Sequence, residues 1–112
     1  MKNFNNKIAA ITGAGSGIGR GLALNLAQQG CRLALADLDE SGLLETVSLA
    51  EQYGVTVSHQ VLDVSNKDAV FSWADQVVAD HGSVNMIFNN AGVALSGTVE
   101  ALSLEDYKWI MD

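Results

Sequence analysis

The feature that most restricts how this chain can fold is a ladder of glycines in the stretch ITGAGSGIGRG (11–21). Glycine occupies every second position of the ladder, at residues 13, 15, 17, 19 and 21. Because glycine loses the most conformational entropy on folding and buries no side chain, such a run is unfavourable unless the backbone must turn sharply or approach another group closely. The apolar run KIAAIT (7–12) precedes the ladder, and apolar residues at helical spacing follow it. This pattern indicates a junction between a strand and a helix.

A glycine-rich junction between a strand and a helix is suited to binding a phosphate. Backbone N–H groups without neighbouring Cβ atoms can come close to an anion, and the following helix adds the positive end of its dipole. We expect Gly13 to form the turn, Gly17 to permit close approach, and Gly19 to let the helix pack on the strand. Ser16 can add a hydroxyl hydrogen bond. The dinucleotide fingerprint G-x-G-x-x-G fits no register of the ladder, so a dinucleotide would be bound through a different spacing.

The order of apolar runs predicts an α/β fold. We expect strands at 7–12, 31–36, 55–62 and 84–90, and helices at 17–29, 40–53, 65–82 and from 103 onward. Ser65 with Asp68, and Ser103 with Asp106, each resemble a capping box at a helix start. Alternating strands and helices with right-handed crossovers predict a Rossmann-like, doubly wound parallel sheet with strand order 3-2-1-4.

The end of the chain predicts an incomplete fold. The helical pattern of EDYKWIMD continues to Asp112 without a stop signal, and four strands leave the fourth as an uncovered edge. We therefore expect residues 1–112 to be the front part of a larger nucleotide-binding domain whose C-terminal strands are missing.

Asp37, at the end of the second predicted strand, is a candidate ligand for a ribose. It lies 18 residues after Gly19, close to the distance at which an acidic residue meets the adenosine ribose in dinucleotide-binding folds. A carboxylate there accepts hydrogen bonds from the ribose hydroxyls and repels a 2′-phosphate, which favours NAD over NADP. The alternative is that the acidic residues of ADLDE serve only to begin a helix.

Polar residues also follow the third and fourth predicted strands. Asp63 and Val64 come after the third, and Asn89 and Asn90 after the fourth. Ligands of doubly wound sheets bind at the carboxyl ends of the strands, so these four residues are candidates for cofactor contact. The segment that begins at Asp63 is also ordinary chemistry for a helix start, and that alternative stays open.

The composition narrows the class of function. A formal net charge of −7 argues against binding nucleic acid or an anionic membrane surface. The single cysteine, Cys31, allows no intrachain disulfide, which is typical of a reducing cytoplasm. His59 and His81 have no partners at ligand spacing, so we expect no metal site.

Taken in order, these motifs resemble the N-terminal part of the short-chain dehydrogenase/reductase family. The family motif T-G-x-x-x-G-x-G is matched by Thr12, Gly13, Gly17 and Gly19, its N-N-A-G motif by Asn89, Asn90, Ala91 and Gly92, and its adenine-flanking Asp-Val pair by Asp63 and Val64. The resemblance implies that Thr12 contacts the N-N-A-G segment and that Ile18 donates a backbone N–H to the pyrophosphate. It also implies a homo-oligomer for the full-length protein.

Two details of the resemblance concern the choice of cofactor. NADP-preferring members often carry Lys or Arg just before the second motif glycine, where this chain has Ser16. Leu38, not a basic residue, follows Asp37. Both agree with NAD. Arg20 is nearby but lies past the motif, on the helix.

The family's catalytic residues are not found in this sequence. The family uses a Tyr-x-x-x-Lys pair, yet Tyr53 is followed four residues later by Val57 and Tyr107 by Met111. We therefore expect an N-terminal fragment of an NAD-dependent enzyme that transfers hydride between an alcohol and a ketone, with no catalytic residues of its own and inactive alone.

Two other functions are considered. The first is a non-catalytic dinucleotide-binding module or subunit. The second is an S-adenosylmethionine-dependent methyltransferase, because GAGSG contains G-x-G-x-G. Two features disfavour the methyltransferase. Ile11 occupies a position where that family usually has an acidic residue, and the chain contains no proline.

Overall fold

The computed structural model describes residues 5–82, 84–90 and 101–102. In chain order the elements are β1 (Ile8–Thr12), α1 (Gly17–Gln28), β2 (Arg32–Asp37), α2 (Glu40–Glu51), β3 (Val57–Val61), α3 (Lys67–His81), β4 (Met86–Asn89) and β5 (Ala101–Leu102). The predicted alternation of strands and helices is confirmed up to β4. The expected last helix, from Ser103 onward, lies outside the described residues.

The strands form one sheet in the order β3-β2-β1-β4-β5, which confirms the predicted order 3-2-1-4. Strands β1, β2, β3 and β4 pair in parallel, whereas β5 pairs antiparallel with β4. The expectation of an uncovered fourth strand is therefore wrong. A strand of two residues is too short to show alternation in the sequence, which is why β5 was not predicted.

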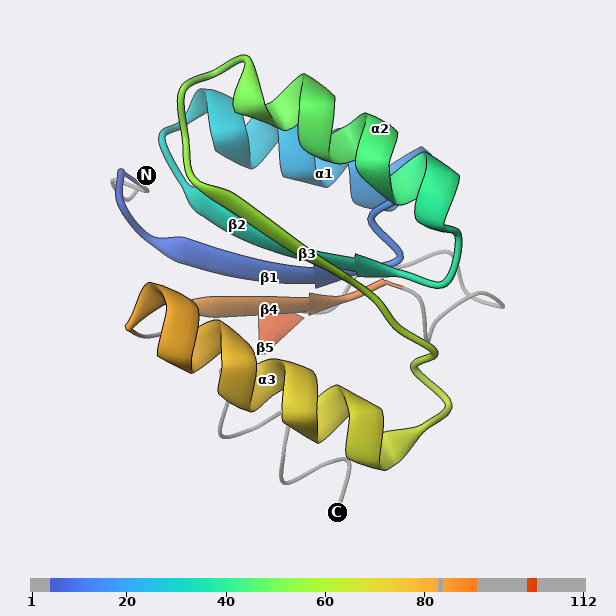
Figure 1. The fold of residues 1–112 in the computed structure, drawn as a ribbon. Helices are drawn as coiled ribbons and strands as arrows, with labels where there is room; N and C mark the ends of the chain where they lie inside the picture. The colour runs from blue at the N-terminus through green and yellow to red at the C-terminus, as the bar shows by residue number, and fades with distance from the viewer. Residues whose placement is uncertain (1–4, 83, 91–100, 103–112) are drawn as a thin grey trace.

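Helices cover both faces of the sheet (Figure 1). Helices α1 and α2 lie side by side on one face, and α3 lies on the other. Successive residues of β1 point to opposite faces, so Ile11 packs with the α1 and α2 side while Ile8 packs with the α3 side. All five residues of β1 are buried, which explains the continuous apolar run at this strand.

Cys31 and Trp73 are part of this core. Trp73 of α3 is buried against the sheet, and Cys31 is buried just before β2. Burial raises the pKa of the Cys31 thiol.

Helix α3 begins one residue later than the predicted capping box. Asn66, not Ser65, is the N-cap, and its side-chain oxygen accepts from the backbone N–H of Ala69 at 3.0 Å. The Ser65 hydroxyl instead donates to Asp63 Oδ1 at 2.7 Å. Asparagine and serine are similarly good N-caps, so the sequence does not distinguish two adjacent candidates. Gly82 ends the helix in the left-handed conformation, as predicted.

Candidate functional site

The ends of three strands bring the predicted site residues to one edge of the sheet. Thr12, the last residue of β1, pairs with Ala36 of β2 and with Asn89 of β4. The glycine ladder, Asp37 and Asn89 therefore leave the sheet at the same level. This is the carboxyl edge, where open parallel sheets bind their ligands.

The backbone of the ladder requires glycine at some positions and not at others. Gly13 and Gly17 have φ of 66° and 55°, a region that other residues rarely adopt. A Cβ on Gly19 would lie 2.0 Å from the carbonyl oxygen of Gly13, so the first turn of α1 packs directly on the loop. Among the described residues, apart from the chain neighbours and the backbone of α1 itself, no atom lies within 4 Å of a Cβ placed on Gly17 or on Gly21. At Gly17 this leaves open space beside the first turn of α1.

Two hydrogen bonds join the ladder to the end of β4. The Thr12 hydroxyl donates to Asn89 Oδ1 at 3.1 Å, the contact that the family resemblance implies. The Asn90 amide donates to the carbonyl oxygen of Gly13 at 3.2 Å. A third bond lies at the other end of the same strands, where the Ile8 N–H donates to Asn85 Oδ1 at 2.9 Å. Ala91 and Gly92, the other two residues of the N-N-A-G motif, lie outside the described residues.

The start of α1 offers polar groups to an anion. Ser16 is the N-cap residue, is exposed, and makes no capping hydrogen bond with its side chain. The first N–H groups of a helix have no partner within the helix. Ile18, in this first turn, leaves 53% of its surface exposed. Together with the open space at Gly17, these groups make the start of α1 a candidate site for a phosphate group.

Asp37 is oriented by two backbone donors. Its Oδ2 accepts from the N–H of Gly15 at 2.7 Å, and its Oδ1 accepts from the N–H of Asp39 at 2.9 Å. The N-cap of α2 is Asp39, which accepts from the N–H of Gly42. Capping of this helix is thus performed by Asp39, and the Asp37 carboxylate is held at the end of β2, beside the ladder.

Arg20 holds the ladder against the start of α2. Its Nη2 donates to the carbonyl oxygens of Gly15 at 2.6 Å and Gly42 at 3.1 Å. Its Nε donates to the Thr46 hydroxyl at 2.8 Å, and the guanidinium also forms an ion pair with Glu45 at 3.0 Å. The sequence shows Arg20 only as a charge near the motif, because its partners lie up to 26 residues away in the chain.

Asp63 and Val64 follow β3 on the same side of the molecule. Asp63 is exposed, and hydrogen bonds from the Ser65 hydroxyl and then from the Ser65 N–H lower the pKa of its carboxyl group. Val64 is half-buried and packs against the cluster under α3. The N–H of Leu62 donates to the carbonyl oxygen of Asp37 at 3.0 Å, so the chain leaves β3 next to the end of β2.

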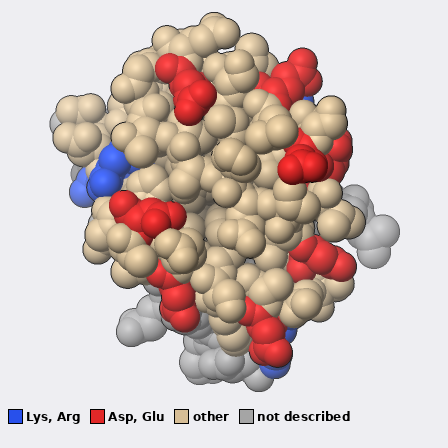
Figure 2. Space-filling view, viewed as in Figure 1, with Lys and Arg blue, Asp and Glu red and all other residues tan. Residues whose placement is uncertain are grey.

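The surface carries acidic groups in several separate places. On the face seen in Figure 2 the Asp and Glu side chains are spread over the surface, and few Lys or Arg side chains appear among them. Within the described ranges, no three His, Cys, Asp or Glu side chains come together in a way that could hold a metal ion. A search of the same residues found no helix with the length and apolarity needed to cross a membrane.

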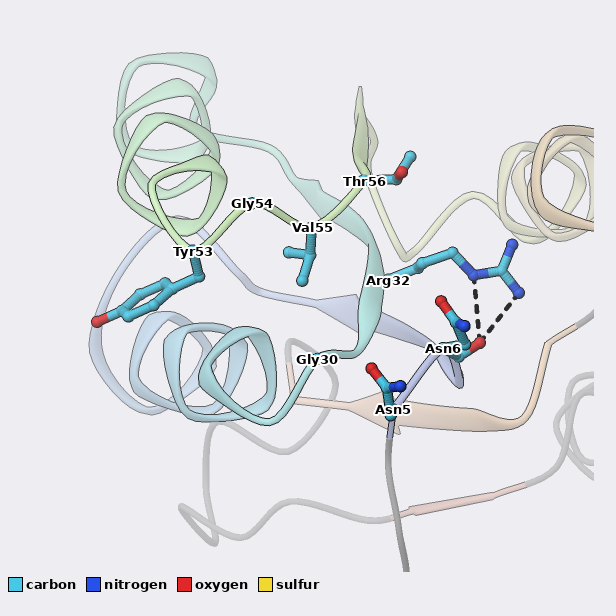
Figure 3. Close-up of a pocket in the computed structure, with 8 residues that line it drawn as sticks. All are labelled: Asn5, Asn6, Gly30, Arg32, Tyr53, Gly54, Val55 and Thr56. Carbon is cyan, nitrogen blue, oxygen red and sulfur yellow. Dashed lines mark hydrogen bonds between the residues drawn. The ribbon is translucent and has the colours of Figure 1, made fainter.

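A pocket of about 290 Å³ lies at the opposite end of the sheet, where the strands begin (Figure 3). It is lined by Asn5, Asn6, Gly30, Arg32, Tyr53, Gly54, Val55 and Thr56. The Arg32 guanidinium donates to the carbonyl oxygens of Asn6 and His81. Its donors are engaged by main chain, and the pocket is remote from the glycine ladder.

His81 closes α3 near this pocket. Its Nε2 lies 2.9 Å from the Ser58 hydroxyl of β3, in hydrogen-bond contact. Burial and then the Arg32 guanidinium lower the pKa of His81 from its ordinary value of 6.5, partly opposed by Asp80. The predicted absence of a metal role for this residue remains a prediction.

Comparison with known proteins assigns the family. The sequence profile of the short chain dehydrogenases matches residues 7–112. SadH of Mycobacterium tuberculosis is 48% identical over 112 residues, which are the whole chain and 41% of SadH. Epidermal retinol dehydrogenase 2 of Homo sapiens is 44% identical over 93 residues, which are 82% of the chain and 30% of the human protein.

Solved structures agree with this assignment. A short-chain dehydrogenase/reductase from Burkholderia phymatum in complex with NAD is 41% identical with a TM-score of 0.74, covering 78% of this chain and 31% of that one. NAD⁺-bound xylitol dehydrogenase is 36% identical with a TM-score of 0.74, covering 77% of this chain and 33% of that one.

The chain belongs to the short-chain dehydrogenase/reductase family. It spans about two fifths of the length of SadH. The family is one of oxidoreductases with a Rossmann fold, and this membership does not fit the methyltransferase alternative.

Proposed function

We propose that this chain is the NAD-binding portion of a dehydrogenase that transfers hydride between an alcohol and a ketone. The proposal is carried by one observation: a half-buried carboxylate, Asp37, stands at the carboxyl end of β2 and accepts a hydrogen bond from the Gly15 N–H of the glycine ladder. NAD-bound structures among the similar proteins support a nicotinamide dinucleotide as the ligand. When bound, NAD supplies the hydride acceptor, and the residues of this chain bind and orient it.

Each part of the edge has a role in this proposal. Gly13 and Gly17 shape the loop around the pyrophosphate, the N–H of Ile18 and the Ser16 hydroxyl donate to it, and Gly19 fixes the helix on the loop. Asp63 and Val64 flank the adenine ring. Thr12 and the segment from Asn89 to Gly92 border the path of the cofactor toward the nicotinamide. The family's Tyr-x-x-x-Lys pair does not occur in the 112 residues, so we assign cofactor binding and not proton transfer to this chain.

The proposed preference for NAD over NADP depends on two charged groups. The Asp37 carboxylate keeps lone pairs for the ribose hydroxyls after accepting from Gly15 and Asp39, because each carboxylate oxygen can accept two hydrogen bonds. A 2′-phosphate would meet this negative charge. Arg20, the basic residue within the glycine ladder, directs its guanidinium to main-chain oxygens, Thr46 and Glu45, and so does not face such a phosphate.

A titration with reduced cofactors tests the proposal. NADH and NADPH are titrated into the purified protein, following the nicotinamide fluorescence. We expect NADH to bind more tightly than NADPH, and Asp37→Asn to weaken NADH binding roughly tenfold, since a hydrogen bond to a charged group is worth about 1.5–3 kcal/mol. The matched control is Asp39→Asn, two residues away, because asparagine remains a good N-cap. Equal affinity for the two cofactors, or equal effects of the two substitutions, would contradict the NAD assignment.

The location and assembly of the protein are part of the same proposal. We propose a cytoplasmic location on the basis of the single buried cysteine, and a homo-oligomer for the full-length protein on the basis of the family resemblance. Light scattering on the purified protein tests the assembly, and a monomer would contradict it.

A further inference from the structure

Gly15 is the residue at which the ladder, β2 and α2 meet. On one side its N–H donates to Asp37 Oδ2 at 2.7 Å, and on the other its carbonyl oxygen accepts from Arg20 Nη2 at 2.6 Å. The two bonds hold the same residue from opposite ends. Gly15 occupies a variable position of the family motif, so neither bond follows from the motif.

The surroundings of Gly15 leave it little freedom to move. A Cβ there would lie 2.8 Å from Asp37 Oδ2 and 3.0 Å from the backbone nitrogen of Leu43. A Cβ on Gly42 would lie 2.6 Å from the carbonyl oxygen of Gly15. The loop and the first turn of α2 are therefore in backbone contact, and both Gly15 and Gly42 present their carbonyl oxygens to the same guanidinium.

The other contacts of Arg20 serve to aim this guanidinium. The Thr46 hydroxyl accepts from Nε and itself donates to the carbonyl oxygen of Gly42 at 3.2 Å. Thr46 is fully buried, so this part of the network is shielded from water. The ion pair with Glu45 is different, because the Glu45 side chain is 65% exposed and an exposed pair contributes little. The bonds to Thr46 and to the two carbonyl oxygens are the ones that fix Arg20.

We propose that Arg20 is a positioning residue for the dinucleotide: by holding the Gly15 carbonyl oxygen it fixes the backbone of Gly15, and the Gly15 N–H in turn orients the Asp37 carboxylate toward the adenosine ribose. The inference rests on the proposed NAD site. A carboxylate whose rotamer is already fixed loses less freedom when it binds the ribose hydroxyls. Without Arg20 the Gly15 carbonyl loses its charged donor. The backbone of Gly15 is then free to change its φ and ψ angles, and the Gly15 N–H no longer holds Asp37 Oδ2 in place.

Arg20 also stabilises the contact between α1 and α2, and the experiment must separate this effect from positioning. Arg32 offers a matched control, because its guanidinium likewise donates to two main-chain carbonyl oxygens but at the opposite end of the sheet. Arg20→Met and Arg32→Met are compared for unfolding in urea and for the dissociation constants of NADH and of 5′-AMP, which carries the adenosine ribose and one phosphate but no nicotinamide half. Arg20→Lys, which keeps the charge and loses the planar fork, provides the comparison if Arg20→Met does not fold.

We expect Arg20→Met to weaken the binding of NADH and of 5′-AMP by the same factor, roughly tenfold. The affinities of Arg20→Lys should be intermediate, and those of Arg32→Met should lie within twofold of wild type. A double-mutant cycle gives the deciding measurement. In an Asp37→Asn background, removing Arg20 should change NADH affinity by less than twofold, because the group that Arg20 positions has been altered.

Two results would overturn the inference, and they are distinguishable. If wild-type protein binds NADH and Arg20→Met has the same effect in both backgrounds, or no greater effect than Arg32→Met, then Arg20 does not act through Asp37. If wild-type protein binds neither NADH nor 5′-AMP, the proposed function fails and the inference fails with it.

Discussion

Two glycines of the same helix, Gly19 and Gly21, should respond in opposite directions to the same substitution by alanine. Both lie in α1 and both gain helix propensity, worth about 0.8–1.0 kcal/mol in a helix interior. At Gly21 no atom of the described residues outside the backbone of α1 lies within 4 Å of the added Cβ, so only this gain remains. Gly21→Ala should therefore stabilise the protein by about 1 kcal/mol.

At Gly19 the new methyl group meets the backbone of the loop. The Cβ would lie 2.0 Å from the carbonyl oxygen of Gly13 and 3.0 Å from Asn90 Nδ2, whereas non-bonded heavy atoms prefer about 3.5 Å. The helix or the loop must move by more than 1 Å. Overpacking of this kind costs about 1–3 kcal/mol, and the upper end applies because the obstacle is main chain. After the propensity gain, Gly19→Ala should destabilise by about 2 kcal/mol.

Thermal unfolding followed by circular dichroism measures both variants. For a domain of this size about 1 kcal/mol shifts the midpoint by 4–8 °C, so Gly21→Ala should raise it by that amount and Gly19→Ala should lower it by roughly twice as much. Urea unfolding checks the free energies independently. If Gly19→Ala is as stable as wild type, or if both variants move in the same direction, the close packing of α1 on the loop is refuted.

Three further predictions concern the ends of α3. Because burial lowers the pKa of His81, the folded state binds its proton less readily than the unfolded state, and the free energy of unfolding should fall as the pH drops below 6.5. In urea unfolding, His81→Gln should remove this part of the pH dependence. His59→Gln, at an exposed position, is the control and should leave the pH dependence unchanged. Asn66→Ala should cost about 1 kcal/mol in the same assay through loss of the N-cap, and an equal cost for Ser65→Ala would contradict the observed cap. Ser65→Ala should instead raise the pKa of Asp63 toward 3.8, measured by NMR titration, and an unchanged pKa would contradict the assigned hydrogen bonds.

Much of the fold could be predicted because its main signals are local. The apolar run of β1 is continuous because the strand is buried on both faces, and Gly82 lies directly after the last apolar turn of α3. Side-chain period and turn chemistry are properties of neighbouring residues, so a single sequence carries them. The predicted N-cap of α3, Ser65, differs by one residue from the observed N-cap, Asn66. Serine and asparagine have similar N-cap preference, so the local sequence does not distinguish them.

The candidate site could be predicted only as a set of residues. The motifs indicate that Thr12 and Asp37 lie at the edge of the sheet, because each follows a recognisable strand. They do not indicate which donor holds Asp37, since the Gly15 N–H becomes available through the turn that the loop makes. The partners of Arg20 follow from the packing of α1 against α2, and no spacing in the sequence specifies them.

The hydrogen bonds between β1 and β4 have a consequence for the order of folding. Hydrogen bonds that involve an asparagine side chain join the pairs Ile8 and Asn85, Thr12 and Asn89, and Gly13 and Asn90, and each spans 77 residues. Contacts of such long sequence separation form slowly, because the intervening chain must first be brought together. The glycine loop is thus made early in synthesis but is tied to its neighbour strand only when residues near 90 have arrived. In the proposed function, the cofactor binds to the folded form of this loop. During synthesis this binding therefore requires that β4 has already paired with β1.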